Sequence, residues 1–228
     1  MKAEAPYTPE DAAVRLWPQL HRVCEALKAL PDAACPGDRA IVILTMHPAE
    51  TASGRRPLSL LKRLGLEVVG SRHATVVPER SFNRRIPEEA TTIELLVVGS
   101  REDYGYWDLT MAPTPFKSIR RIESIRLPGL EDRWRDRSVD GSRLDVNGRL
   151  VVDATLTSAR LNPADVVGCL DEYVRTLDGE VERRYERFTG MRIDVPLRVA
   201  VARLPELAQF SMLVSARPMA RVALRDNA

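Results

Sequence analysis

The sequence is poor in aromatic residues and has no long hydrophobic run. Only 5% of its 228 residues are aromatic, although 44% are hydrophobic and 29% are charged. No stretch approaches the roughly 18 consecutive apolar residues that a membrane-spanning helix needs. Residues 1–16 have no apolar core and do not form a secretory signal. We therefore expect a soluble, cytoplasmic protein that does not bind membranes.

Residues that commonly carry catalysis or bind metals are also scarce. Cys24, Cys35 and Cys169 form no Cys-x-x-Cys pair, which indicates reduced thiols and no disulfide framework. The three histidines have no zinc-type spacing, and the chain contains neither a Gly-x-Ser-x-Gly elbow nor a phosphate-binding loop. We expect no catalytic residue, no metal and no cofactor. An enzyme of unfamiliar type would require a pocket that gathers His47 or His73 with carboxylates.

The basic residues are mostly arginine, and lysine is rare. Arginine pairs such as Arg55-Arg56 and Arg183-Arg184 have acidic residues close by, and the formal net charge is only +2. A nucleic-acid-binding surface would need its arginines gathered on one face. The interspersed charges favour an ordinary solvated surface.

The first part of the chain mixes helices and strands. The pattern of apolar residues predicts these elements: a helix over 9–30 with Val14 and Trp17 in its apolar stripe and Pro18 inside it, a strand over 40–47 covered on both faces, a helix over 57–64 closed by Gly65, two short strands or one bent strand over 66–79, and a strand over 92–100. Residues 101–114 are expected to form a loop. Residues 116–127 fit either a strand or a helix.

The last third of the chain gives a regular order of elements. The expected elements are a half-buried strand over 150–158, a helix that starts at Asn162-Pro163 and is closed by Gly179, an edge strand over 180–188, a strand over 192–203 with Leu197, Val199 and Val201 on one face, a helix over 204–210, and a strand over 211–218. This βαββαβ order is the ferredoxin-like arrangement, an antiparallel sheet with helices on one face.

The fold class is therefore α+β, with an N-terminal α/β portion over 1–140 followed by a ferredoxin-like portion over 141–228. The charged segment 128–142 is the expected boundary. RNA-binding domains of ferredoxin-like topology stack bases on aromatic side chains of the central strands. The predicted central strands, 150–158 and 197–203, carry no aromatic residue, so nucleic acid is not an expected partner.

Two segments resemble a known family. Residues 38–79 (DRAIVILTMHPAETASGRRPLSLLKRLGLEVVGSRHATVVPE) are similar to the region upstream of the protease domain in large bacterial subtilisin-like peptidases, which are often encoded beside an AAA-type ATPase. Residues 197–224 (LRVAVARLPELAQFSMLVSARPMARVAL) look like the strand-helix-strand that closes a subtilase pro-region. The segments cover about a third of the chain, and the Asp-Ser/Thr-Gly, His-Gly-Thr and Gly-Thr-Ser-Met motifs of the catalytic domain are absent from it.

The resemblance implies a non-catalytic pro-region that assists folding of a subtilisin-like serine protease domain and inhibits it, in cis or after cleavage, with an AAA-type ATPase as a further partner. The open sheet face would dock the protease through small or polar residues: Asp153, Thr155, Thr157, Arg198, Ala200 and Ala202. The C-terminal tail would lie extended in the protease cleft. The candidate partner-binding residues there are Arg217, Pro218, Met219, Leu224, Arg225, Asp226, Asn227 and Ala228. The alternative is a stand-alone regulatory or scaffold domain with no protease partner.

Overall fold

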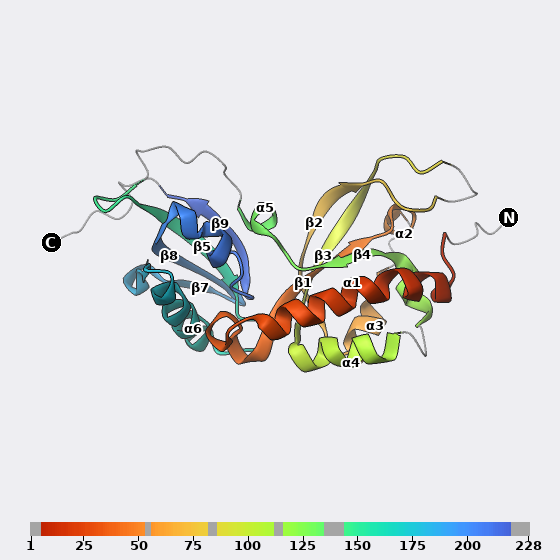
Figure 1. Cartoon of the computed structure of the whole chain (residues 1–228), viewed down its shortest axis with the longest axis horizontal. Coiled ribbons are helices and arrows are strands. Elements are labelled where there is room, and N and C mark those ends of the chain that lie inside the picture. Colours follow the sequence, from red (N-terminus) through yellow and green to blue (C-terminus); the bar gives the residue numbers. More distant parts are fainter. Residues whose placement is uncertain (1–5, 53–55, 82–85, 112–115, 135–143, 220–228) are drawn as a thin grey trace. The chain divides into compact units, whose positions relative to one another are not determined.

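The protein has two compact units, which Figure 1 shows in a computed structural model. The structure describes residues 6–52, 56–81, 86–111, 116–134 and 144–219. The first unit comprises Met1–Ala29 and Ala40–Leu127, and the second comprises Leu30–Arg39 and Pro128–Ala228. The division thus lies at Pro128, at the start of the charged segment, and a short N-terminal stretch joins the second unit.

The first unit contains a four-stranded sheet, and its described elements follow in chain order: α1 (Pro9–Ala29), β1 (Arg39–Met46), α2 (Pro48–Ala52), α3 (Leu58–Arg63), β2 (Glu67–Val76), β3 (Ala90–Ser100), α4 (Arg101–Met111), the 3-10 helix η4 (Lys117–Arg121) and β4 (Ile122–Arg126). The strand order is β2-β3-β1-β4. β2 is antiparallel to β3, and β1 is antiparallel to β4. Every residue of β1 from Ala40 to Met46 is buried, as the apolar run predicts.

Helix α1 packs on α4 and lies along β4 (Figure 1). Its buried stripe contains Leu16, Leu20 and Leu27, among others, and Gln19 accepts a hydrogen bond from the backbone amide of Ile125 at 2.9 Å. The prediction that Val14 and Trp17 belong to this stripe is wrong, because both are exposed. The helix continues through Pro18.

The loop predicted over 101–114 is wrong where the structure describes it, because Arg101–Met111 is helix α4. Its start is a reciprocal cap: the Ser100 hydroxyl accepts from the Asp103 amide at 3.0 Å, and the Asp103 carboxylate accepts from the Ser100 amide at 2.9 Å. Such a box satisfies two backbone donors that a helix start otherwise leaves unpaired. Tyr104 and Trp107 are fully buried on the inner side of this helix.

Two open assignments in the first unit are resolved. Residues 67–76 form one strand with an irregularity between Val68 and Gly70, so the bent-strand interpretation holds. Residues 116–127 contain both alternatives in turn, η4 and then β4. Gly65 follows α3 with φ of +73°, which is the left-handed closure expected of it.

The second unit contains the sheet predicted from the last third of the chain. Its described elements are η1 (Asp32–Ala34), η2 (Pro36–Asp38), α5 (Leu130–Arg133), β5 (Arg149–Thr157), α6 (Pro163–Thr176), β6 (Glu180–Val181), η6 (Arg183–Tyr185), β7 (Arg187–Thr189), β8 (Arg192–Ala200), η7 (Val201–Arg203), α7 (Leu204–Leu207) and β9 (Leu213–Pro218). The strand order is β6-β8-β5-β9, with β7 also paired to β8, and these strand pairings are antiparallel. This is the ferredoxin-like order, and the α+β class is confirmed.

Helices α6 and α7 lie on the same side of the second sheet (Figure 1). The Tyr173 hydroxyl of α6 donates to the Glu206 carbonyl of α7 at 2.8 Å, and the Tyr173 ring packs beside Phe210. At the start of α6, the Asn162 side chain accepts from the Ala164 amide, as predicted. At its end, Asp178 takes the left-handed conformation, with φ of +57°.

The structure corrects three details of the second unit. The predicted edge strand over 180–188 is two short strands, β6 and β7, separated by a 3-10 turn. Strand β8 ends at Ala200, so Val201 is exposed and does not share the inner face with Leu197 and Val199. Helix α7 has one turn, not the two that were expected.

Candidate docking face on the second sheet

Alternation along the two central strands gives the second sheet an inner and an outer face. Leu150, Val152, Ala154 and Leu156 of β5 are fully buried, as are Ile193, Val195, Leu197 and Val199 of β8. Successive side chains of a strand point to opposite faces. Asp153 and Thr155 therefore lie on the other face, together with Asp194, which is the cross-strand partner of Thr155.

The polar residues of this face form two neighbouring hydrogen-bonded groups, which together we call the second outer face: Asp153, Thr155, Arg192, Asp194 and Arg217. The Thr155 hydroxyl donates to Asp194 at 2.6 Å, and Arg192 Nε donates to both oxygens of Asp194 at 2.9 and 2.8 Å. Arg217 donates to Asp153 from Nη2 at 2.8 Å and from Nε at 3.1 Å.

The carboxylates of the second outer face are recessed, and the guanidinium groups project. The side chains of Asp153 and Asp194 are 15% and 20% exposed, whereas those of Arg192 and Arg217 are 59% and 66% exposed. Burial alone would raise the pKa of Asp194, but the hydrogen bonds from Arg192 and Thr155 outweigh it and lower the pKa. Asp194 is therefore ionised at neutral pH and holds Arg192 in place.

A shallow hollow of about 270 Å³ opens on this face. Its lining residues are Asp153, Tyr185, Arg187, Arg192, Asp194, Pro196, Arg217 and Met219. Arginine side chains offer planar groups of donors that suit carboxylates and backbone carbonyls of a partner. The described lining therefore offers arginine donors to the carboxylates and carbonyls of a partner.

The candidate residues predicted for the C-terminal tail fall partly on this face. Arg217 and Pro218 end β9, and the Met219 amide donates to the Val151 carbonyl at 2.8 Å, so these three extend the sheet. Leu224, Arg225, Asp226, Asn227 and Ala228 lie outside the described residues. Of the predicted docking residues, Thr157 is buried and Ala202 lies in η7, so neither contributes as expected.

The histidines singled out by the sequence occupy different settings in the first unit. His47 is 2% exposed, its Nδ1 accepts from the Ala49 amide at 3.2 Å, and its Nε2 bonds the Arg80 carbonyl at 2.9 Å. Nε2 also lies 3.9 Å from Glu123 Oε2. His73 lies on β2 opposite Ile93. The two ring nitrogens of His47 are thus engaged by the backbone.

A polar cluster around Glu123 escaped the sequence-based interpretation. The Tyr7 hydroxyl lies 3.1 Å from both carboxylate oxygens, the Glu79 amide donates to Oε1 at 2.9 Å, and Arg15 stacks on the Tyr7 ring at 4.2 Å. Burial raises the pKa of Tyr7 to about 12. A hollow of about 350 Å³ lies beside the cluster. Tyr7 and Glu123 are 116 residues apart, and no local pattern connects them.

No protein-family model matches the chain, and no curated protein matches it. Within the described residues, no group of three or more His, Cys, Asp or Glu side chains is placed to hold a metal ion. No described helix is long and apolar enough to span a membrane.

Proposed function

We propose that the chain is a non-catalytic protein-binding module that docks a subtilisin-like serine protease domain through the second outer face. In this role it acts as the pro-region of the protease, assisting its folding and inhibiting it. The observation that carries the proposal is the ferredoxin-like sheet whose outer face presents arginine donors over recessed aspartates. The family resemblance of residues 38–79 and 197–224 supports the choice of partner.

The contacts of Arg217 to Met219 support a role for the chain beyond β9. Arg217, Pro218 and Met219 continue the edge strand β9, and the hydrogen bond from the Met219 amide to the Val151 carbonyl holds the end of this stretch on the sheet. An extended segment of this kind can bind a protease cleft through its main chain. We propose an AAA-type ATPase as a further partner of the first unit, on the resemblance alone.

The test measures inhibition of a subtilisin-type catalytic domain encoded by the genes at the same locus. The purified chain is titrated into that protease with a chromogenic peptide substrate, and the mixture is passed over a size-exclusion column. We expect saturable inhibition and a co-migrating complex. Absence of a subtilisin-type domain from those genes, or a protease that is neither bound nor inhibited, would contradict the proposal.

The alternative role, a regulatory or scaffold domain without a protease partner, has one observation in its favour. Val14 and Trp17 on α1 and Tyr106 and Leu109 on α4 are exposed large hydrophobic side chains. Contiguous exposed apolar residues mark protein-binding surfaces, and α1 packs on α4. This role predicts that substitutions at Trp17 and Leu109 weaken partner binding, whereas substitutions at Arg192 and Arg217 leave it unchanged.

A further inference from the structure

The two units share one topology. In the first unit the elements that follow α1 run β1, α2 and α3, β2, β3, α4, β4, and the sheet order read from the other edge is β4-β1-β3-β2. In the second unit the order is β9-β5-β8-β6, with α6 and α7 at the two helix positions. Each sheet therefore places its first and third strands in the centre, between its fourth and second strands. Both units are βαββαβ folds of the ferredoxin-like type.

Helix α4 packs against one face of the first sheet. A Cβ atom on Gly99 would come within 3.4 Å of the Tyr104 ring of α4 and closer to Leu66, so this position on β3 faces the helices. Glu94 is out of phase with Gly99 and points to the opposite side. Arg72 is the cross-strand partner of Glu94, and it shares that side. We call this side the first outer face and define it by Thr45, Arg72, Glu94, Ser124 and Arg126.

The two outer faces carry the same residue types at equivalent positions. A threonine on the first strand is the cross-strand partner of a serine on the fourth: Thr45 with Ser124, and Thr155 with Ser215. The threonine hydroxyl bonds an acidic residue on the third strand, Glu94 at 3.4 Å and Asp194 at 2.6 Å. An arginine follows each serine by two residues, Arg126 and Arg217.

The charge arrangement is similar but its pairs differ, because Arg126 bonds Glu94 on the third strand whereas Arg217 bonds Asp153 on the first strand. Glu94 is 8% exposed in its side chain and is bonded by Arg72 Nε at 2.7 Å and by Arg126 Nη2 at 3.0 Å. The side chains of Arg72 and Arg126 are 34% and 39% exposed. As on the second outer face, the anion lies underneath and the cationic groups lie above it. An approaching partner meets guanidinium donors, which are complementary to carboxylates.

From this repetition we propose that the first outer face is a second docking surface of the same kind, and that both outer faces bind carboxylate-bearing polypeptide. The proposal rests on the docking role argued for the second outer face and extends it to two sites in one chain. Polypeptide is favoured over nucleic acid because the central strands carry no aromatic side chain on either outer face that could stack on a base. A partner molecule that contacts both outer faces at once would bind with higher avidity than one that contacts a single face.

The test counts the acidic peptides that the full chain binds. The probe is a fluorescein-labelled dodecapeptide of alternating glutamate and serine, and its stoichiometry is measured by isothermal titration and by anisotropy at low salt. We expect two peptides per chain for the wild type and one for the second-face variant R192Q/R217Q. The first-face variant is R72Q/E94Q/R126Q, which removes the buried acid together with its arginines so that no unpaired carboxylate remains. We expect one peptide for it and none for the combined variant.

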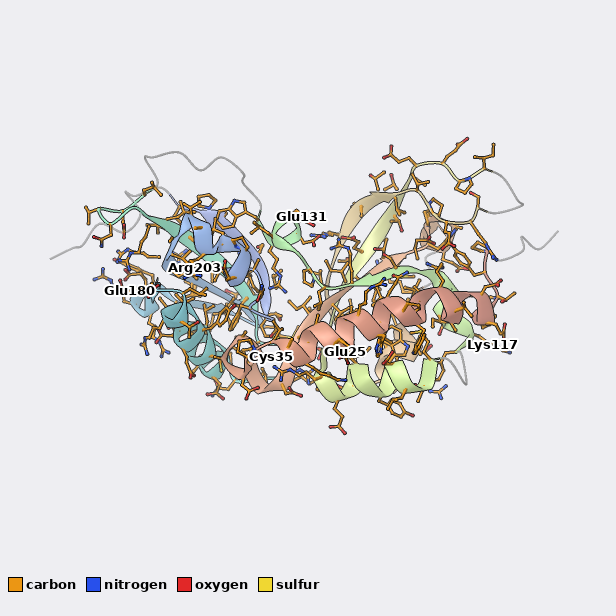
Figure 2. All side chains as sticks on the ribbon, viewed as in Figure 1. Glu25, Cys35, Lys117, Glu131, Glu180 and Arg203 are labelled. Atoms are coloured by element: carbon orange, nitrogen blue, oxygen red, sulfur yellow. The ribbon has the colours of Figure 1, made fainter. Side chains whose placement is uncertain are left out.

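The control is R175Q/R203Q, which removes two exposed arginines outside both faces, one on α6 and one just before α7, where Figure 2 marks Arg203. It should still bind two peptides, and thermal unfolding by circular dichroism verifies that every variant is folded. Three results would overturn the proposal. They are a loss of bound peptide in the control equal to that in the face variants, two peptides still bound by R72Q/E94Q/R126Q, and no peptide bound by the wild type. Displacement of the peptide by oligo-dT at lower concentration than by unlabelled peptide would identify nucleic acid as the preferred ligand and would also overturn it.

The outcome separates this inference from the proposed function. Two bound peptides without inhibition of the protease would support two docking faces and contradict the protease partner. Suppose instead that the wild type inhibits the protease and binds one peptide, and that only R192Q/R217Q loses this peptide. That result would support the protease partner and contradict docking through the first outer face.

Discussion

Tyr7 brings a hydroxyl group into a buried site beside a carboxylate. It is 3% exposed and donates to Glu123, while its oxygen accepts from the Arg80 amide at 3.1 Å. Burial raises the pKa of Tyr7 to about 12, Arg15 opposes the rise, and the charge of Glu123 adds to it. Tyr7 lies just before α1 and bonds both Arg80, which follows β2, and Glu123 of β4, so it stabilises the first unit from its N-terminal edge.

We predict that Tyr7→Phe lowers the free energy of unfolding by about 1–2 kcal/mol at neutral pH, because Glu123 loses a buried hydrogen-bond donor. Above pH 10 the unfolded tyrosine ionises while the folded one keeps its proton up to about pH 12. The folded state then holds more protons than the unfolded state, so the wild-type stability falls across this window. Urea unfolding of both proteins between pH 7 and 12 measures the difference. The difference in the free energy of unfolding between the wild type and Tyr7→Phe should shrink above pH 10. A difference that stays constant with pH would contradict the burial of the Tyr7 hydroxyl.

At the scale of elements, two glycines show how position decides the effect of a side chain. Gly105 lies inside α4, and a Cβ there would meet nothing within 4 Å. Gly179 follows the end of α6, and a Cβ there would lie 2.6 Å from the Arg198 carbonyl oxygen and 2.6 Å from Val174 Cγ1. The sequence pattern assigned Gly179 the left-handed closure of the helix, but Asp178 takes that conformation and Gly179 is required for close packing.

We predict that Gly105→Ala stabilises the protein by about 0.5–1 kcal/mol, since alanine loses less backbone entropy in a helix. Gly179→Ala should destabilise it by about 1–3 kcal/mol, because β8 or α6 must shift to make room. Thermal and urea unfolding of the two variants give opposite signs if the packing is as described. Destabilisation by both, or by neither, would contradict it.

The elements that the sequence predicted well are those with local signals. The apolar run of β1 and the Asn162-Pro163 start of α6 are examples. The error at α4 had a local signal too, since Ser100 and Asp103 have the spacing of a capping box, although residues 101–114 were expected to form a loop. With residues 67–76 as the single strand β2 and residues 101–111 as the helix between β3 and β4, the first unit also has the βαββαβ order. The repetition was hidden by the wrong loop assignment over 101–114 and by the alternatives left open over 66–79 and 116–127.

The candidate site was less predictable than the strands that carry it. Alternation along β5 placed Asp153 and Thr155 on the outer face, but the hydrogen bonds to Asp194 and Arg217 depend on the register between strands. The cluster around Tyr7 and Glu123 depends on packing between segments far apart in the chain. Strand order and register are set by tertiary contacts, which a single sequence does not display.

At the scale of the whole molecule, the chain contains two folds of the same topology whose outer faces share a polar centre. The second outer face projects its arginines further than the first, and it continues into the segment that follows β9. These features favour the second outer face as the main docking surface. We therefore expect Arg192 and Arg217 to contact the proposed protease partner.

The measurement that tests this claim most directly is the inhibition constant of R192Q/R217Q for the subtilisin-type protease, with R175Q/R203Q as the charge-matched control. Two exposed arginine contacts contribute about 1–2 kcal/mol together, so we predict an inhibition constant raised about tenfold by R192Q/R217Q. The control should stay within about twofold of the wild type. Equal inhibition constants for all three proteins would contradict docking through the second outer face.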